Sequence, residues 1–139
     1  MTAEAVRAEV EVEVRYAETD QMGVVHHANY LVWFELARTN LCTISGFHYA
    51  GIEELGYHLM VTAAEARYRK GARYGDHLRI VAWVDRLASR GLRFSYQVLR
   101  AEELLATGAT EHVWVDAGTG RLCRTPEVLR EPFARLAGR

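Results

Sequence analysis

The chain has 139 residues, of which half are hydrophobic and a quarter are charged, and its formal net charge is −1. This length fits one domain spanning residues 1–139, and the composition is typical of a globular protein and excludes a disordered chain. The near-zero net charge gives no global basicity that would indicate a nucleic acid or an anionic membrane as partner. No apolar run approaches the ~20 residues that insert stably across a bilayer.

The charged N-terminal residues and the cysteine content indicate a cytoplasmic protein. Glu4, Arg7 and the three glutamates that follow exclude the apolar core of a signal peptide at this end of the sequence. Cys42 and Cys123 are the only cysteines, so one disulfide is possible but a disulfide scaffold is excluded. Two reduced thiols are the favoured interpretation.

A strand and a long helix are the first predicted elements. From Ala8 to Tyr16, valines alternate with charged residues, which is the pattern of a half-buried strand. A helix then begins near Asn29 and ends before Gly46, its predicted C′ residue. Its apolar residues recur at helical spacing, so we expect burial on most sides. They are Tyr30, Phe34, Ala37, Leu41 and Ile44, widened by Trp33 and Leu36.

Four more strands and a closing helix follow a short helical turn at residues 51–56. The strands are predicted at residues 58–69, 78–85, 92–98 and 104–115, separated by turn-like segments. Successive strands with short turns are expected to pair antiparallel. Thr125 and Pro126 predict the N-cap and first residue of the last helix. The element order predicts an α+β fold, with an antiparallel sheet wrapped around one long central helix.

Large apolar side chains are also expected on the outer face of this sheet, drawn from Trp83, Phe94, Tyr96 and Trp114. The sequence leaves open which of the four face outward. Their number favours self-association, because large exposed apolar patches mark interfaces.

The segment from Tyr16 to Tyr30 concentrates groups that can do chemistry between a strand and a helix. The negative charge of Asp20 can interact favourably with the dipole of the helix that follows, or its side chain can form an Asx turn. It can also act as a general base or nucleophile on a carbonyl, while N–H groups at the helix start hold the developing oxyanion. Gly23 lets the backbone turn sharply.

A metal site is an alternative interpretation of the same segment, which we disfavour. Adjacent histidines on a strand-like segment point opposite ways, so His26 and His27 would not readily share one ion. The other histidines show no ligand spacing such as HExxH. No serine-nucleophile, P-loop or dinucleotide motif occurs, and Cys42 is interpreted as a packed thiol.

Basic residues form a second group between two predicted strands. Four positive charges fall within seven residues, which can neutralise phosphates, although a solvated strand face gives the same pattern. Arg90 and Arg93 in the next turn either join this group or are solvated. The four are Arg67, Arg69, Lys70 and Arg73.

The run VRYAETDQMGVVHHANYLVWFELART, from Val14 to Thr39, resembles the signature of the hotdog-fold acyl-CoA thioesterases. The subgroup is the 4-hydroxybenzoyl-CoA thioesterase-like one, with the Tol-Pal-associated acyl-CoA thioesterases. The run ARYRKGARYGDHLRI, from Ala66 to Ile80, is similar to the family's second block. The resemblance implies a hotdog fold, a homodimer or homotetramer with sites at subunit interfaces, and hydrolysis of an acyl-CoA substrate to a carboxylic acid and free CoA.

The resemblance also implies roles for single residues. Asp20 matches the catalytic carboxylate, acting as nucleophile or as general base. The backbone N–H of His27 would polarise the thioester carbonyl, Tyr16 would lie near the carboxylate, and His26 receives no catalytic role. No metal or cofactor is expected beyond the CoA of the substrate. Three basic residues are expected to bind that substrate: Lys70, Arg73 and Arg90.

Two other functions stay open at this point. A hotdog hydratase or dehydratase would act on acyl thioesters with an acid–base pair at the second and third carbons of the acyl chain. A non-catalytic acyl-CoA-binding module is the alternative from another class, and the lack of a DNA-binding segment in this sequence argues against a regulator.

Overall fold

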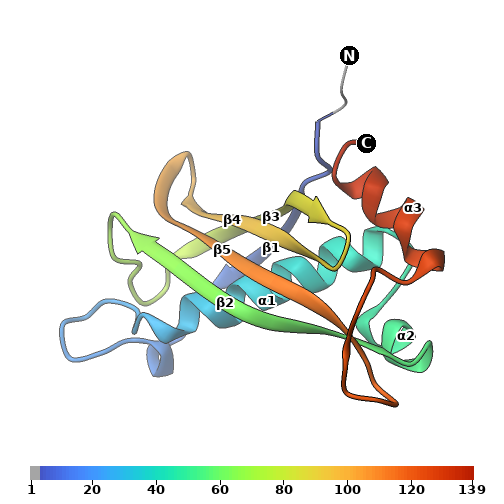
Figure 1. Ribbon diagram of the computed structural model, residues 1–139. Coiled ribbons are helices and arrows are strands. Elements are labelled where there is room, and N and C mark those ends of the chain that lie inside the picture. Colours follow the sequence, from blue (N-terminus) through green and yellow to red (C-terminus); the bar gives the residue numbers. More distant parts are fainter. Residues whose placement is uncertain (1–3) are drawn as a thin grey trace.

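The computed structural model describes residues 4–139, in which one curved sheet holds a long helix against its concave face (Figure 1). The strands are β1 (Ala8–Glu13), β2 (Tyr57–Tyr68), β3 (His77–Ala88), β4 (Gly91–Arg100), β5 (Glu103–Asp116) and β6 (Leu122–Cys123). The helices are α1 (Ala28–Ile44), α2 (Tyr49–Glu54) and α3 (Glu127–Leu136), and a 3-10 turn spans Tyr16–Glu18. The predicted α+β arrangement is confirmed.

The sheet has the strand order β1-β3-β4-β5-β2, with β6 added to β5, and every pair is antiparallel. The expectation that successive strands pair is right for β3, β4 and β5 and wrong for β2 and β3. The connection between β2 and β3 runs past the start of α1 instead of folding back on β2. There the Val25 N–H donates to the Ala72 carbonyl at 2.8 Å and the Val14 N–H donates to the Asp76 carbonyl at 2.9 Å. β2 does not pair with β3. It pairs with β5 and forms the edge of the sheet opposite β1.

Helix α1 packs on the sheet through the predicted apolar stripe. Phe34 is fully buried and stacks on Tyr96 of β4, with ring centroids 4.4 Å apart. Gly108 of β5 makes room for this ring, since a Cβ there would lie 2.3 Å from Phe34 Cε2. The expected burial of Leu36 and Ile44 is wrong, because 48% and 53% of these residues are exposed. Gly46 follows α1 with a φ of +98°, as predicted for a C′ residue.

Most of the large apolar strand residues lie on the inner face of the sheet, not on the outside. Phe94, Tyr96 and Trp114 are buried, because alternation along β4 and β5 places them on the inner face. The expectation that they contribute to the outer face is therefore wrong. Trp83 alone of the four stays partly exposed, and the Arg7 guanidinium carbon lies 4.1 Å from its ring centroid.

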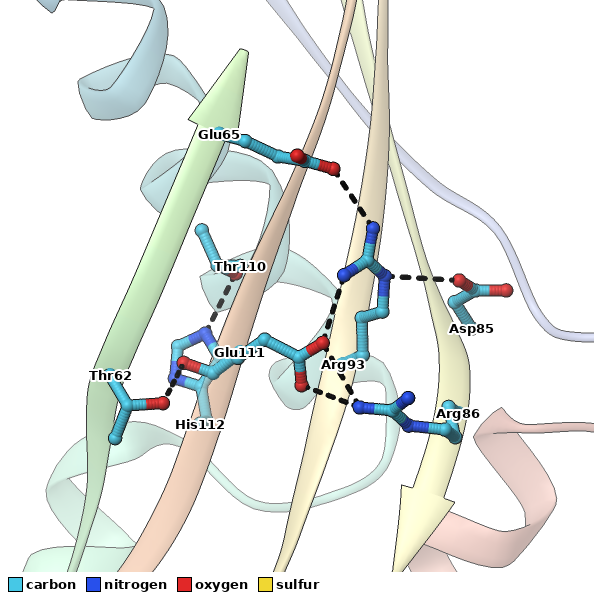
Figure 2. Close-up of polar contacts among 8 residues, drawn as sticks. All are labelled: Thr62, Glu65, Asp85, Arg86, Arg93, Thr110, Glu111 and His112. Atoms are coloured by element: carbon cyan, nitrogen blue, oxygen red, sulfur yellow. Dashed lines mark hydrogen bonds and ion pairs between the residues drawn. The ribbon is translucent and has the colours of Figure 1, made fainter.

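A charged network covers the outer face of the sheet instead (Figure 2). Arg93 on β4 contacts Glu111 at 2.8 Å, Glu65 at 3.0 Å and Asp85 at 3.3 Å, and Arg86 also contacts Glu111 at 2.8 Å. Hydrogen bonding to Glu111 raises the pKa of Arg93, and the same bond is the main cause of the lowered pKa of Glu111. We call these five residues the Arg93 network, which joins β2, β3, β4 and β5.

The C-terminal elements close the end of the sheet away from the start of α1 (Figure 1). α3 begins at Glu127 after Pro126, one residue later than predicted. Thr125 does not cap it, because its N–H and hydroxyl both donate to the Ser89 carbonyl. Phe133 of α3 contacts Trp114 edge to face. None of the helices within residues 4–139 is long and apolar enough to cross a membrane.

Candidate functional site

The loop of residues 14–27 links β1 to α1 and projects from the sheet beside the N-terminus of the helix (Figure 1). The Asp20 N–H donates to the Val24 carbonyl at 2.9 Å, and the Gly23 N–H donates to the Asp20 carbonyl at 3.0 Å. Gly23 has a φ of +80°, a conformation that side chains with a Cβ rarely adopt. The loop is therefore a tight hairpin with Asp20 at its base.

The two carboxylate oxygens of Asp20 are in different situations. Oδ1 accepts the Met22 N–H at 2.8 Å, which is the Asx turn expected from the sequence. Within residues 4–139, Oδ2 has no hydrogen-bond or ion-pair partner, and the residue is exposed. One oxygen thus fixes the side chain while the other is open to a ligand.

Asp20 lines an open hollow of about 640 Å³ between the loop and the helix start. Tyr16 lies in its wall, and its ring contacts Tyr74 edge to face with centroids 5.7 Å apart. The structure therefore brings Tyr16 and Asp20 to one place, as expected. The lining residues are Tyr16, Ala17, Thr19, Asp20, Gln21, His26 and Asn29.

The N-terminus of α1 leaves one donor available beside this hollow. The Ala28 N–H donates to His26 Nδ1 at 3.3 Å, and the Asn29 N–H donates to the His26 carbonyl at 3.0 Å. The His27 N–H has no acceptor within residues 4–139. An unpaired N–H at a helix start can hydrogen-bond a carbonyl oxygen, and the helix dipole favours negative charge there.

The arrangement of the two histidines differs from expectation. Their rings stack with centroids 4.2 Å apart and do not point opposite ways, because His27 already has helical dihedral angles. His26, which was given no catalytic role, lines the hollow with Asp20. Among residues 4–139, no group of three or more His, Cys, Asp or Glu side chains is placed to hold a metal ion.

The predicted substrate-binding cations lie at different distances from the loop. Arg73 is adjacent to it, since a Cβ on Gly23 would lie 3.7 Å from Arg73 Nη1. Lys70 lies in the same β2–β3 connection and pairs with Glu103, which lowers the pKa of that carboxyl. Arg90 lies beyond the far end of β3, whose 12 residues span about 36 Å. Within one chain, Arg90 does not join the other two.

The sequence interpretation missed Glu18 and its contacts with Trp33 and Asn29, which hold the loop in place. Glu18 is buried and accepts the indole N–H of Trp33 at 3.2 Å, and the Asn29 side chain donates to the Glu18 carbonyl at 3.0 Å. The available signal was Trp33, because a tryptophan on a buried helix face needs an acceptor for its N–H.

Comparison with known proteins shows which family the chain resembles. Residues 14–133 match the thioesterase-like superfamily. A protein of Bacillus subtilis named as a candidate acyl-CoA thioesterase, YneP, is 39% identical over 107 residues, covering 76% of this chain and 78% of YneP. The protein TT1821 of Thermus thermophilus has a similar structure, with a TM-score of 0.88, 36% identity and coverage of 93% and 98% of the two chains.

A third relative is the DHNA-CoA thioesterase of Staphylococcus aureus. Its structure matches with a TM-score of 0.87 and 31% identity, covering 94% of this chain and 90% of that one. These matches confirm the expected hotdog fold and the resemblance drawn from residues 14–39 and 66–80. The narrower Tol-Pal-associated subgroup stays a prediction.

Proposed function

Because the chain belongs to the thioesterase-like superfamily and hydrolyses acyl-CoA thioesters, we propose that Asp20 and the N-terminus of α1 form its active site. The observation that carries the proposal is that the loop leading into α1 holds both a carboxylate with an open oxygen, Asp20 Oδ2, and the unpaired N–H of His27, whose neighbours His26 and Asn29 line the hollow with Asp20. A carboxylate and an oxyanion donor are the minimum that hydrolysis of a reactive thioester needs.

In the proposed reaction, the thioester carbonyl oxygen accepts the His27 N–H, and the dipole of α1 stabilises the negative charge that develops there. Asp20 either removes a proton from the attacking water or attacks the carbonyl carbon itself, giving an anhydride that water then opens. In both routes the C–S bond breaks, the CoA sulfur leaves and takes up a proton, and the acyl group departs as a carboxylic acid. Neither route uses a metal or a redox cofactor.

Neighbouring residues have supporting roles in the proposal. Tyr16 lies in the wall of the hollow and would contact the substrate beside Asp20. Arg73 lies against the catalytic loop, so it is the favoured partner for the CoA phosphates. Lys70 shares its charge with Glu103, and Arg90 lies too far away to contact the same substrate within one chain.

We further propose that the protein acts as a homodimer with its sites near the subunit interface. The outward side of α1 exposes Leu31, Val32 and Leu36, and the neighbouring edge strand β2 exposes Val61, which lines a shallow hollow with Leu31 and Val32. An apolar helix face beside an unpaired strand edge is the kind of surface that a second copy covers. The expected cytoplasmic location is part of the proposal, in line with the low cysteine content.

The test is hydrolysis by the Asp20→Asn variant. Asparagine keeps the Asx turn through its side-chain oxygen but cannot act as base or nucleophile. We expect kcat to fall by about 10³-fold, a loss typical of removing a principal catalytic group, with the fold unchanged. Thiol release is measured over CoA esters of graded length, including aromatic acyl groups. Wild-type turnover by this variant with any good substrate contradicts the proposal.

Two controls separate the alternatives. An enoyl thioester that loses its ultraviolet absorbance without releasing thiol would identify a hydratase. Tight binding of CoA esters with no thiol release across the panel would identify a binding module.

Dialysis against EDTA should leave the hydrolysis rate unchanged, and loss of activity restored by a divalent cation would overturn the metal-free route.

A further inference from the structure

Glu18 is a buried carboxylate two residues before Asp20. It is 7% exposed, at the foot of the loop that carries the proposed active site. Its Oε1 accepts the Arg15 N–H at 2.8 Å, and its Oε2 accepts the Trp33 indole N–H at 3.2 Å. Burying a carboxylate is costly unless its oxygens are hydrogen-bonded, and both oxygens of Glu18 are.

The Glu18–Trp33 bond connects the loop to the interior of α1. Trp33 is 2% exposed and lies five residues after Ala28, about 7.5 Å along the helix axis. Its ring packs against Tyr30, with centroids 5.0 Å apart, so its position is fixed by the core. Through this bond, a rigid helix residue holds the carboxylate of the loop.

The backbone of Glu18 also links the loop to the start of α1. Its carbonyl accepts the His26 N–H at 2.8 Å and the Asn29 side-chain amide at 3.0 Å. The residue is thus bonded to the strand side of the loop, to its returning arm and to the first turn of α1. Asp20 lies two residues after Glu18, and His27 directly follows His26.

From these contacts we infer that Glu18 is a positioning residue that sets the location of the Asp20 carboxylate relative to the His27 N–H. The inference rests on the proposed role of Asp20. Glu18 itself is covered and lies outside the hollow lined by Asp20. A shift of about 1 Å between reacting groups can reduce turnover by about 100-fold, so a bond that fixes the loop acts on kcat.

The test uses the donor and acceptor pattern of the Glu18–Trp33 bond. In Glu18→Gln, the amide oxygen can still accept the Arg15 N–H, but the amide NH₂ then faces the Trp33 N–H, so two donors oppose each other. Trp33→Phe removes the indole donor. The double variant relieves the conflict but lacks the bond. The matched control is Glu11→Gln, which changes an exposed glutamate on β1.

We expect Glu18→Gln and Trp33→Phe each to lower kcat by about tenfold, with KM changed less than twofold, because binding groups stay in place. In the double variant, kcat should match that of Trp33→Phe and should not show the product of the two losses. Glu11→Gln should keep wild-type kcat. All rates are divided by the folded fraction, measured by circular dichroism, so that a loss of folded protein is not counted as a loss of turnover.

Several results would overturn the inference. The first is a wild-type kcat in Glu18→Gln. The second is a loss of kcat in the double variant equal to the product of the two single losses. The third is a loss of kcat that vanishes after correction for the folded fraction. Asp20→Asn is assayed in parallel. If Asp20→Asn is inactive and Glu18→Gln is fully active, the positioning role fails and the proposed function stands. If Asp20→Asn is fully active, the proposed active site itself fails.

Discussion

Asp20 shows how one side chain can satisfy two interpretations of a sequence. An Asx turn and a catalytic carboxylate were alternatives, yet a carboxylate has two oxygens, and the turn uses only Oδ1. The Met22 N–H restricts rotation of the side chain and leaves Oδ2 without a partner among residues 4–139, in a residue that lines the hollow. The local turn therefore orients the group that the proposed chemistry needs.

His112 is a buried residue whose ionisation affects the stability of the fold. It lies on the inner side of β5, where its Nε2 and Thr110 Oγ1 are 2.8 Å apart (Figure 2). Burial, and next the positive charge of Arg38, lower the pKa of His112 to about 4. The unfolded chain, with an ordinary histidine pKa of about 6.5, binds the proton more tightly. Stability from this group is therefore complete above pH 6.5 and is lost as the pH falls toward 4.

We predict that the wild-type free energy of unfolding decreases by about 2 kcal/mol between pH 7 and pH 5 because of His112. The decrease should be largely absent in His112→Leu, which has no titrating group at this position. Urea unfolding at both pH values measures it. His58→Gln, at an exposed site on β2, is the control and should keep the wild-type dependence. An unchanged pH dependence in His112→Leu would refute the assignment.

At the scale of the elements, periodicity predicted each long strand and helix within a few residues. The alternation of Leu78, Ile80, Ala82 and Val84 corresponds to the buried side of β3. Strand pairing was less predictable, because nothing local in β2 specifies β5 as its neighbour. β6 was missed altogether, since two residues are too few to show an alternation.

The Arg93 network makes a prediction about the stability of the sheet. Arg93→Met leaves Glu65, Asp85 and Glu111 without their shared cation. The Arg93 side chain is 29% exposed in the wild type, so solvent screens its contacts only in part. We expect a loss of roughly 1–2 kcal/mol in the free energy of unfolding. Arg86→Met is the matched control, because this side chain is 61% exposed and contacts Glu111 alone, and it should cost less than about 0.5 kcal/mol.

Urea unfolding in low salt and in 0.5 M NaCl checks this prediction. The difference between Arg93→Met and wild type should shrink in high salt, which screens the ion pairs. Equal losses in the two arginine variants would show that the network contributes no more than an isolated surface pair.

For the whole molecule, the exposed face of α1 and the edge of β2 predict the assembly state. Val32→Glu places a charge in the middle of the apolar surface that we propose the second copy covers. We expect the variant to be monomeric at concentrations where the wild type is a dimer, and to lose thioesterase activity in parallel. Sedimentation velocity measures the mass. Val128→Glu, at an exposed valine of α3, is the control and should stay dimeric. A monomeric wild type would refute the proposal.

The candidate site was predictable in its central residues and not in its support. Asp20, Gly23 and His27 follow one another within a short segment, so their types and spacing already indicated chemistry. Trp33 signals that an acceptor for its N–H is needed but not which residue supplies it, so Glu18, fifteen residues away in the sequence, could not be identified. Arg90 could not be placed from sequence either, because its distance from the loop depends on how far β3 extends.

The edge position of β2 also affects the order in which the chain assembles. β3, β4 and β5 follow one another and can pair as soon as each turn forms, whereas β2 pairs with a strand that begins 35 residues after β2 ends. During synthesis, β2 leaves the ribosome before its partner exists, and its backbone groups must bond to water until β5 arrives. Closing so long a loop is slow compared with forming a hairpin. The strand proposed to meet a second subunit is thus among the last to join its own sheet.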